Sequence, residues 1–273
     1  MITRVLRLTA AELLKLRAHP FLWISLVVVV FFTMTGAALG GPAPSLWRQD
    51  HAIAMFASGA RIGLKLSTYV LLIFGSMLFA GEFDKGTIKI LLTRPITRTD
   101  LFAAKSIAAM LLALFLIATV LYTSLAVGCS LGELGPVWDD ESYNARRYDE
   151  LVDHAKRAVA MSVAAVVAAV FFGVLVSNLV ESSGFATAIA LTAFLVGDEV
   201  LLRVFRDDMT RRFFFSVYPG YAFDVLRDYA TGSSIAWKGA YVNGRAYLWV
   251  PLATVGACVA GGFGVFKMRN ITA

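Results

Sequence analysis

The densest group of residues that could do chemistry lies at positions 81–105, "GEFDKGTIKILLTRPITRTDLFAAK", where eight charged side chains stand between two long apolar runs. Gly86 and Thr87 can begin a helix there, because a threonine hydroxyl can cap free backbone amides. Arg94 precedes a proline, which ends that helix. One side of such a short helix is apolar and the other is cationic. We therefore expect it to dock into a groove on another protein.

Residue types for other chemistry are sparse. The three histidines, His19, His51 and His154, are far apart and form neither an H-E-x-x-H motif nor a Cys/His cluster, so no metal site is expected. Cys129 and Cys258 fall at or inside apolar runs and give no disulfide framework. No G-x-x-x-x-G-K-[ST] occurs, so the chain cannot hold nucleotide phosphates by the usual loop. We expect no catalytic, cofactor-binding or metal-binding residue and no enzyme activity in this chain.

The elements that must position the hairpin are set by composition. The chain is 58% hydrophobic with a mean hydropathy of +0.71, whereas soluble domains contain roughly 45–50% apolar residues. A helix needs about 20 residues to cross a hydrocarbon core of about 30 Å. We predict an all-α membrane protein in which one transmembrane domain, 21–266, contains six transmembrane helices and is followed by a cytoplasmic tail, 267–273. The predicted spans are 21–40, 62–80, 106–128, 158–177, 185–202 and 246–266.

Two of these spans contain or adjoin charges. Span 62–80 includes Lys65, which we place close enough to the outer end for its side chain to snorkel toward the headgroups. Span 185–202 has only 13 uncharged residues before Asp198 and Glu199. That length suits a buried core helix better than a full span, unless the acids lie at the interface. A proton-binding or cation-binding role for these acids is the alternative to interfacial solvation.

The N-terminal segment, 1–20, has the pattern of an amphipathic helix on the membrane surface. Ile2, Val5 and Leu13 recur at helical spacing, with the basic residues mostly elsewhere around the helix. His19-Pro20 ends it. The alternative is that this segment is only a positively charged flank that fixes the orientation of the first span. The sequence "GAALGGPAPS" after the first span has the small residues of a cleavage site, but the long charged segment before it favours a retained span.

The orientation follows from the basic residues around the first span. The N-terminal flank carries four of them and the loop 41–61 carries two. By the positive-inside rule the N-terminus is cytoplasmic. Six spans then place the hairpin and the C-terminus on the same side.

Two longer segments would lie on the outer side. Segment 129–157 is rich in charged residues, which predicts a solvated loop. In segment 203–245, Ala222, Phe223 and Leu226 recur at helical spacing after Pro219. This predicts a short helix lying in the outer interface, or alternatively a surface helix packed on the loop. Either segment could contact an extracytoplasmic protein.

The hairpin also resembles a known family. In permeases of type-2 ATP-binding-cassette exporters, the corresponding hairpin typically contains E-x-x-x-G-T. This is followed by L-L, a proline, a basic residue and a lysine at the start of the next span. The matching residues here are Glu82, Gly86, Thr87, Leu91, Leu92, Arg94, Pro95, Arg98 and Lys105. The segment "AAELLKLRAHPFLWISL" is similar to the helix that precedes the first span in that family. After residue 128 only the topology agrees.

The resemblance implies a membrane subunit that forms a homodimer and binds two copies of a cytosolic ATPase, which would carry the ATP and magnesium. Its coupling helix would correspond to residues 86–93, between spans two and three. The residues expected to dock the ATPase are Glu82, Gly86, Thr87, Ile88, Leu91, Leu92, Arg94 and Arg98.

Two functions remain open from the sequence. The first is the permease subunit of an exporter in a bacterial inner membrane. The alternative is a membrane scaffold or mechanotransmitter that couples a cytosolic ATPase to an extracytoplasmic partner without transport. A secondary transporter is disfavoured because only the fifth span carries acids. Nucleic-acid binding is not expected, since the chain lacks a soluble domain with a basic aromatic platform.

Overall fold

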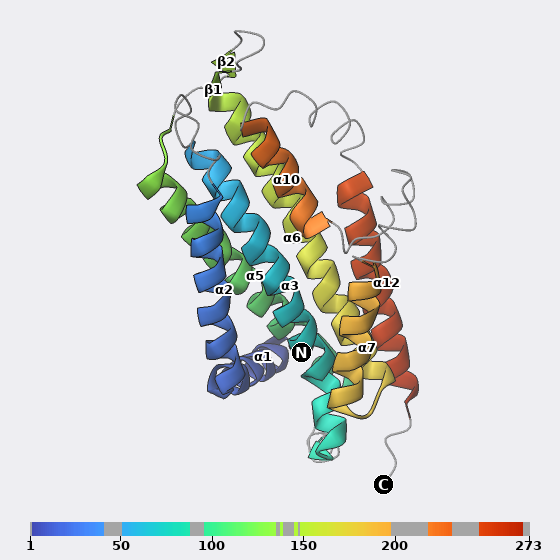
Figure 1. Ribbon diagram of the computed structural model, residues 1–273. Helices are drawn as coiled ribbons and strands as arrows, with labels where there is room; N and C mark the ends of the chain where they lie inside the picture. The colour runs from blue at the N-terminus through green and yellow to red at the C-terminus, as the bar shows by residue number, and fades with distance from the viewer. Residues whose placement is uncertain are drawn as a thin grey trace.

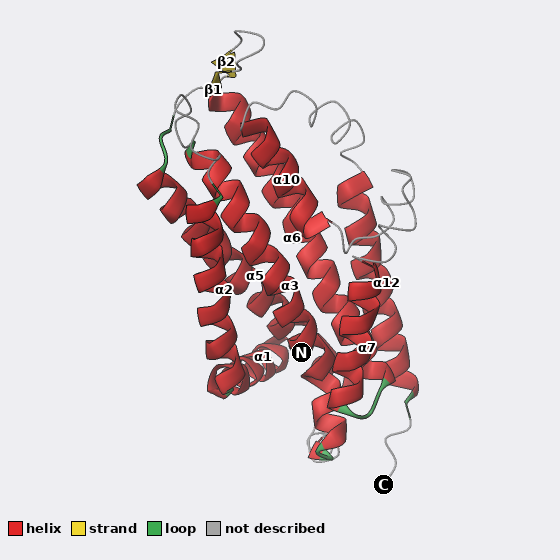
Figure 2. Ribbon diagram, in the orientation of Figure 1, coloured by secondary structure: helices red, strands yellow, loops and turns green. Residues whose placement is uncertain are grey.

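The computed structural model describes residues 2–40, 51–87, 96–134, 137–138, 145–146, 148–197, 218–230 and 246–269. Within these ranges the regular structure is almost entirely helical (Figure 2). The helices are α1 (Ile2–Ala18), α2 (Pro20–Leu39), α3 (Ala52–Asp84), α5 (Arg98–Leu131), α6 (Tyr148–Leu179), α7 (Ser183–Leu195), α10 (Tyr218–Ala230) and α12 (Ala246–Met268). Two short antiparallel strands, β1 (Val137–Trp138) and β2 (Ala145–Arg146), pair between α5 and α6. The predicted helical fold agrees with this architecture.

The long helices stand side by side, and α1 lies across one end of them (Figure 1). The end of α3, the start of α7 and the end of α12 lie at that same end (Figure 1). We call it the α1 end. The other end of the bundle carries β1 and β2.

Five helices of the described part are long and apolar enough to cross a membrane: Pro20–Leu39, Ala52–Asp84, Arg98–Leu131, Tyr148–Leu179 and Leu248–Met268. Five of the six predicted spans fall within them or overlap them almost completely. The helices α3, α5 and α6 extend beyond the predicted spans because their charged or polar ends continue the helix outside the apolar run. The chain is therefore a multi-pass membrane protein.

The fifth predicted span, 185–202, is only partly represented. Its described part is the apolar helix α7, which has 13 residues. Such a helix is about 20 Å long, shorter than a hydrocarbon core of about 30 Å. Residues 198–202 lie outside the described residues, so the six-span count stays a prediction.

Helix α10 packs differently from the expectation of a helix in the outer interface. It runs alongside α6 instead of across the helix ends (Figure 1). Phe223 and Leu226 are fully buried, and the Phe223 ring meets Phe56 of α3 edge to face at a centroid distance of 5.8 Å. The periodicity indicated an amphipathic helix, but it did not reveal that the apolar face packs against α3 and α6.

Two helix boundaries have clear local causes, and the one at His19 and Pro20 is the one that the sequence predicts. His19 has an extended backbone, and Pro20 occupies the first turn of α2, where its missing amide hydrogen is not needed. The hydroxyl of Thr97 accepts a hydrogen bond from the Asp100 backbone amide at 3.2 Å. Thr97 is therefore the N-cap of α5.

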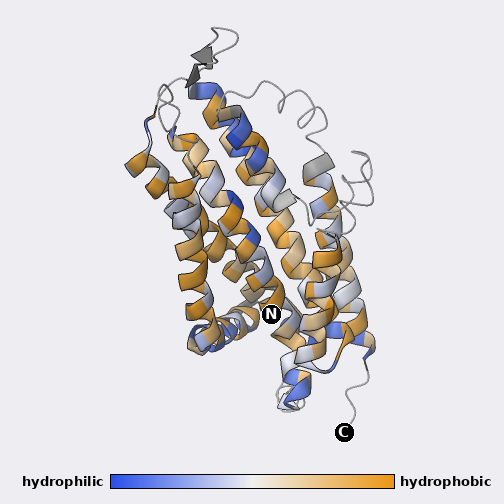
Figure 3. Ribbon diagram, in the orientation of Figure 1, coloured by the Kyte–Doolittle hydropathy of each residue, from blue (hydrophilic) through white to orange (hydrophobic). Residues whose placement is uncertain are grey.

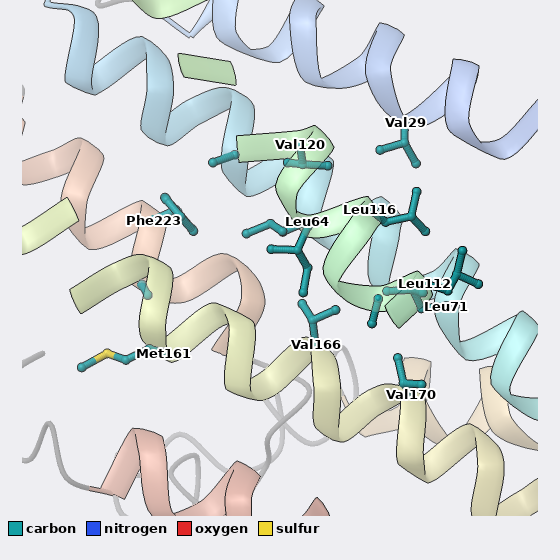
Figure 4. Packing of buried hydrophobic residues seen from close by; sticks show 14 of the residues in the cluster. Val29, Leu64, Leu71, Leu112, Leu116, Val120, Met161, Val166, Val170 and Phe223 are labelled. Carbon is teal, nitrogen blue, oxygen red and sulfur yellow. The ribbon is translucent and has the colours of Figure 1, made fainter. Parts of the chain in front are cut away.

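The core is formed where α3, α5 and α6 meet, with α2 and α10 covering its sides. Figure 4 shows side chains from these helices gathered around Leu64, Val120 and Val166. Helices α3 and α6 approach closely at two glycines. A Cβ atom on Gly75 would lie 2.7 Å from the Val170 carbonyl oxygen, and one on Gly173 would lie 2.9 Å from that of Leu72. Only glycine fits this crossing without a backbone shift.

Candidate functional site

The candidate site is a group of charged residues at the α1 end of the bundle. Helix α1 packs on α5 there, and the Thr9 hydroxyl lies 3.4 Å from the Ala104 carbonyl oxygen. Glu12, the acidic residue of α1, is buried and points to the same side of the helix. The amphipathic pattern of α1 thus places one carboxylate against the ends of α3 and α5.

Lys105 on α5 is the centre of this group. Its side chain is 1% exposed, and its Nζ atom lies 2.9 Å from Glu82 Oε1 and 3.2 Å from Glu12 Oε2. It also donates a hydrogen bond to the Leu78 carbonyl oxygen at 3.0 Å. The three donors of the ammonium group are therefore matched by three acceptors, as burial of a lysine requires.

Lys15 closes the group on its exposed side. Its Nζ lies 2.7 Å from Glu12 Oε1 and 3.2 Å from Glu82 Oε1, and its side chain is 54% exposed. Lys105, Glu82, Lys15 and Glu12 thus form a network of alternating charge, which we call the Lys105 cluster. It connects α1, the end of α3 and the start of α5.

The cluster shifts the pKa values of the two groups on α1. Burial raises the pKa of Glu12, but the charges of Lys105 and Lys15 and their hydrogen bonds outweigh it, so the pKa lies below 4.5. Burial lowers the pKa of Lys15, but its hydrogen bond to Glu12 and the charges of Glu12 and Glu82 outweigh it, so the pKa lies above 10.5. Both groups are held in their charged forms at neutral pH.

Glu82 has a second feature. Its Oε1 atom receives both lysines, whereas its buried Oε2 atom has no hydrogen-bond partner among the described residues. A buried carboxylate oxygen accepts hydrogen bonds strongly. Glu82 is therefore able to accept one further donor without breaking the cluster.

The predicted docking residues next to Glu82 are only partly described. Gly86 has a φ angle of 66°, in the left-handed region, where it turns the chain after the end of α3. The Thr87 hydroxyl donates back to the Glu82 carbonyl oxygen at 3.4 Å. The helix that Thr87 is predicted to cap lies outside the described residues. Ile88, Leu91, Leu92 and Arg94 lie outside the described residues, so the coupling helix stays a prediction.

Arg98, another predicted docking residue, binds within the chain. Its Nη1 atom donates to the carbonyl oxygens of Phe266, Lys267 and Arg269 at 3.4, 3.2 and 2.8 Å. These carbonyls end α12, where a positive charge is favoured by the helix dipole. Arg98 thus ties the start of α5 to the end of α12.

Arg269 extends the same arrangement to α6. It donates to the Asn178 carbonyl oxygen at 2.8 Å and pairs with Glu181 at 2.9 Å. Its guanidinium also lies over the Phe83 ring of α3, 3.9 Å from the centroid. The helix ends at the α1 end are therefore joined by polar contacts as well as by apolar packing.

The sequence pattern identified Glu82 and Lys105 but not their partners on α1. Glu12 was the available signal, because it is the single acidic residue among the basic ones of segment 2–17. Its burial on a basic helix indicates a cationic partner on another element. No group of three or more metal-ligating side chains occurs in the part of the chain that the structure describes.

This geometry defines a class: a multi-pass helical membrane protein whose charged contacts gather where its helices meet one membrane face. Residues 8–141 match the family model for ABC-2 family transporter proteins, a family of transporter membrane (permease) components. Over this segment, which contains the whole Lys105 cluster, the chain is similar to that family. Such components are not themselves ATPases, in agreement with the missing phosphate loop. No curated protein matches the chain.

Proposed function

We propose that the chain is the permease subunit of an exporter in a bacterial inner membrane, with its N-terminus in the cytoplasm. It works as a homodimer driven by two cytosolic ATPase subunits, which hold the ATP and magnesium. The observation that carries this proposal is the buried Lys105 cluster, which connects three helix ends beside the hairpin expected to dock the ATPase.

The cluster provides a route for mechanical coupling. The hairpin segment 88–95 leaves from α3 and returns to α5. Because Lys105 binds both Glu82 on α3 and Glu12 on α1, a displacement of the hairpin moves the three helix ends together. Because Arg98 on α5 binds carbonyl oxygens at the end of α12, the same displacement also moves α12. Movement of packed helices as rigid elements then changes the side from which the passage is open.

In the proposed docking step, apolar contacts with the ATPase are made by Ile88, Leu91 and Leu92. Arg94 is the cationic residue beside them. The Oε2 atom of Glu82, which has no hydrogen-bond partner among the described residues, supports the proposal, since it would accept a donor from the ATPase. An apolar groove on the ATPase would then receive the hairpin, because burying those side chains is favourable only against a matching apolar surface.

The docking step is tested by capture of the ATPase. The tagged chain is purified from its own membranes, and copurifying subunits are labelled with a photoreactive ATP analogue. The Leu91→Asp, Leu92→Asp double variant would bury carboxyl groups without partners, and even a neutral polar group without a hydrogen bond costs about 2–7 kcal/mol. We therefore expect ATPase capture to fall by at least about 30-fold, since about 1.4 kcal/mol corresponds to tenfold.

The control is Leu179→Asp, which makes one such leucine-to-aspartate change at a side chain that is 57% exposed at the α1 end. This variant is expected to retain the ATPase. Equal capture by the double variant and the control would remove the hairpin from its docking role.

Transport itself needs a separate measurement. The purified complex is placed in lipid vesicles that contain cell extract, and mass spectrometry follows compounds whose distribution changes with ATP. An ATP-dependent change supports the exporter. ATPase capture without any such change would refute transport and leave the mechanotransmitter as the function.

A further inference from the structure

A charged face lies near the other end of the bundle, on α3 and α10. Arg61 Nε on α3 pairs with Asp224 Oδ1 on α10 at 2.9 Å, with 45% and 37% of the two side chains exposed. Lys65, one turn along α3, and Arg227 and Asp228 on α10 all interact electrostatically with Asp224. Figure 3 shows hydrophilic segments in the upper half of α3, within an otherwise mainly hydrophobic bundle.

The depth of this face can be read from α2, which packs beside α3. A Cβ atom on Gly36 would meet Ile62, and one on Gly63 would meet Thr33. The segment from Arg61 to Lys65 therefore lies beside Thr33 and Gly36. These two residues stand about 5–9 Å before the end of α2, at about 1.5 Å per residue.

Helix α2 reaches across the hydrocarbon core. Its 20 residues carry no charge, and its length of about 30 Å equals the thickness of the core. It follows α1, whose amphipathic pattern places it at the membrane surface. The charges of α3 thus lie inside the outer part of the core, and Lys65 is the deepest of them.

At the same height, α2 exposes apolar side chains, whereas α3 exposes the charged Arg61 and Lys65. Phe31, Phe32 and Met34 are 60%, 47% and 47% exposed. Apolar side chains exposed at this depth face lipid or an apolar surface of a second copy of the chain, not water. Charged side chains at this depth are strongly disfavoured against lipid and face the protein interior or a water-filled cavity instead.

We propose that Arg61, Lys65, Asp224 and Asp228 line the outer mouth of a water-filled passage and contact the charged, hydrated part of the cargo. This inference rests on the proposed transport function and adds the location of the passage. The alternation of cations and carboxylates on neighbouring helices keeps the mouth hydrated and offers partners to a charged cargo group.

Arg61 also lies close to the first turn of α10. A Cβ atom on Gly220, in the first turn of α10, would lie 4.0 Å from Arg61 Cγ. Further along α10, Phe223 and Leu226 anchor it in the core. The helix therefore presents its charged side to the passage because its apolar side is already buried against α3 and α6.

Cysteine labelling tests the proposal without any ATPase or cargo. In a background with Cys129→Ser and Cys258→Ala, single cysteines replace Lys65, Asp228 or, as the control, Phe31. Membranes are treated with a charged, membrane-impermeant methanethiosulfonate, which reacts with thiolates. A thiolate forms in water but not in hydrocarbon.

We expect Lys65→Cys and Asp228→Cys to react at least about tenfold faster than Phe31→Cys, because only the first two thiols would ionise in water. Phe31 is the matched control because it is exposed and stands at nearly the height of Lys65. Equal rates at positions 65 and 31, whether both fast or both slow, would overturn the proposal. Each variant is first checked for membrane insertion and a single elution peak, and the second position, on α10, keeps the test informative if one variant fails to fold.

The labelling result is independent of the transport result. A fast reaction at position 65 with no ATP-dependent flux would keep the water-filled mouth and refute the exporter. Flux with a slow reaction at position 65 would keep the exporter and refute this location of the passage.

Discussion

The Lys105→Met substitution is expected to lower the free energy of unfolding by about 3–5 kcal/mol, because removing one partner of a buried ion pair leaves the opposite charge uncompensated. Lys105 is 1% exposed and binds two carboxylates at 2.9 and 3.2 Å. Without it, Glu12 and Glu82 share only Lys15, which is 54% exposed. Methionine keeps the length of the side chain, so the loss of charge is the main change.

The assay is thermal unfolding of the purified chain in detergent, followed by tryptophan fluorescence. For a domain of this size, each kcal/mol shifts the melting temperature by about 2–4 °C, so a fall of about 6–20 °C is expected. Lys156→Met is the matched control. Its pair with Asp153 has a similar length, 3.1 Å, but both side chains are largely exposed. Such a surface pair contributes about 0–1 kcal/mol, and the control is expected to shift by less than about 4 °C.

A second variant separates lost charge from lost packing. Adding Glu12→Gln and Glu82→Gln to Lys105→Met removes the uncompensated carboxylates, so much of the melting temperature should return. The reasoning would be refuted if Lys105→Met shifted the melting temperature no more than Lys156→Met. It would also be refuted if the triple variant unfolded at a still lower temperature than Lys105→Met.

Three further predictions concern pH, helix packing and topology. The lowered pKa of Glu12 means that its charge stabilises the fold above pH 4.5 and ceases to do so as the pH falls through the folded-state value, whereas the raised pKa of Lys15 means that its contribution is lost as the pH rises above 10.5. The melting temperature should therefore fall at both extremes of pH. In Glu12→Gln it should fall less steeply with decreasing pH than in the unaltered chain; the same acid dependence in both would contradict this. Gly173→Ala should cost about 1–3 kcal/mol by overpacking, measured by the same unfolding assay against Gly81→Ala, where a Cβ atom meets nothing within 4 Å; equal stability of the two variants would argue against a tight crossing. Cysteines at positions 90 and 145 should label from opposite sides of the membrane, and tags at 182 and 215 should do the same; same-side results would reject the six-span topology or the fifth span, respectively.

The spans and several helix ends could be predicted because each depends on a local property. An apolar run of sufficient length must be helical in a membrane, where backbone groups find no water. Pro20 and Thr97 act on their own backbone neighbours, so their effects are visible in the sequence. The 13-residue α7 shows the limit of this reasoning, since apolar length alone does not distinguish a full span from a shorter helix.

The Lys105 cluster and the docking of α10 depend on contacts between distant segments. Glu12 and Lys105 are 93 positions apart, and periodicity gives the polar side of each helix but not its partner. Arg98 was interpreted as a docking residue because its charge and position fit the family pattern. Its contacts with the end of α12 could not be foreseen without the arrangement of the bundle.

The connection of α1 to residues far along the chain has a consequence for biosynthesis. Glu12 leaves the ribosome 93 residues before Lys105. At about 5–20 residues per second, roughly 5–19 s pass before its buried partner exists. During that interval Lys15, one turn away on the same helix, is the cation that Glu12 can already bind. The one carboxylate of newly made α1 therefore already has a partner on its own helix, and the arrival of Lys105 fastens α1 to the bundle.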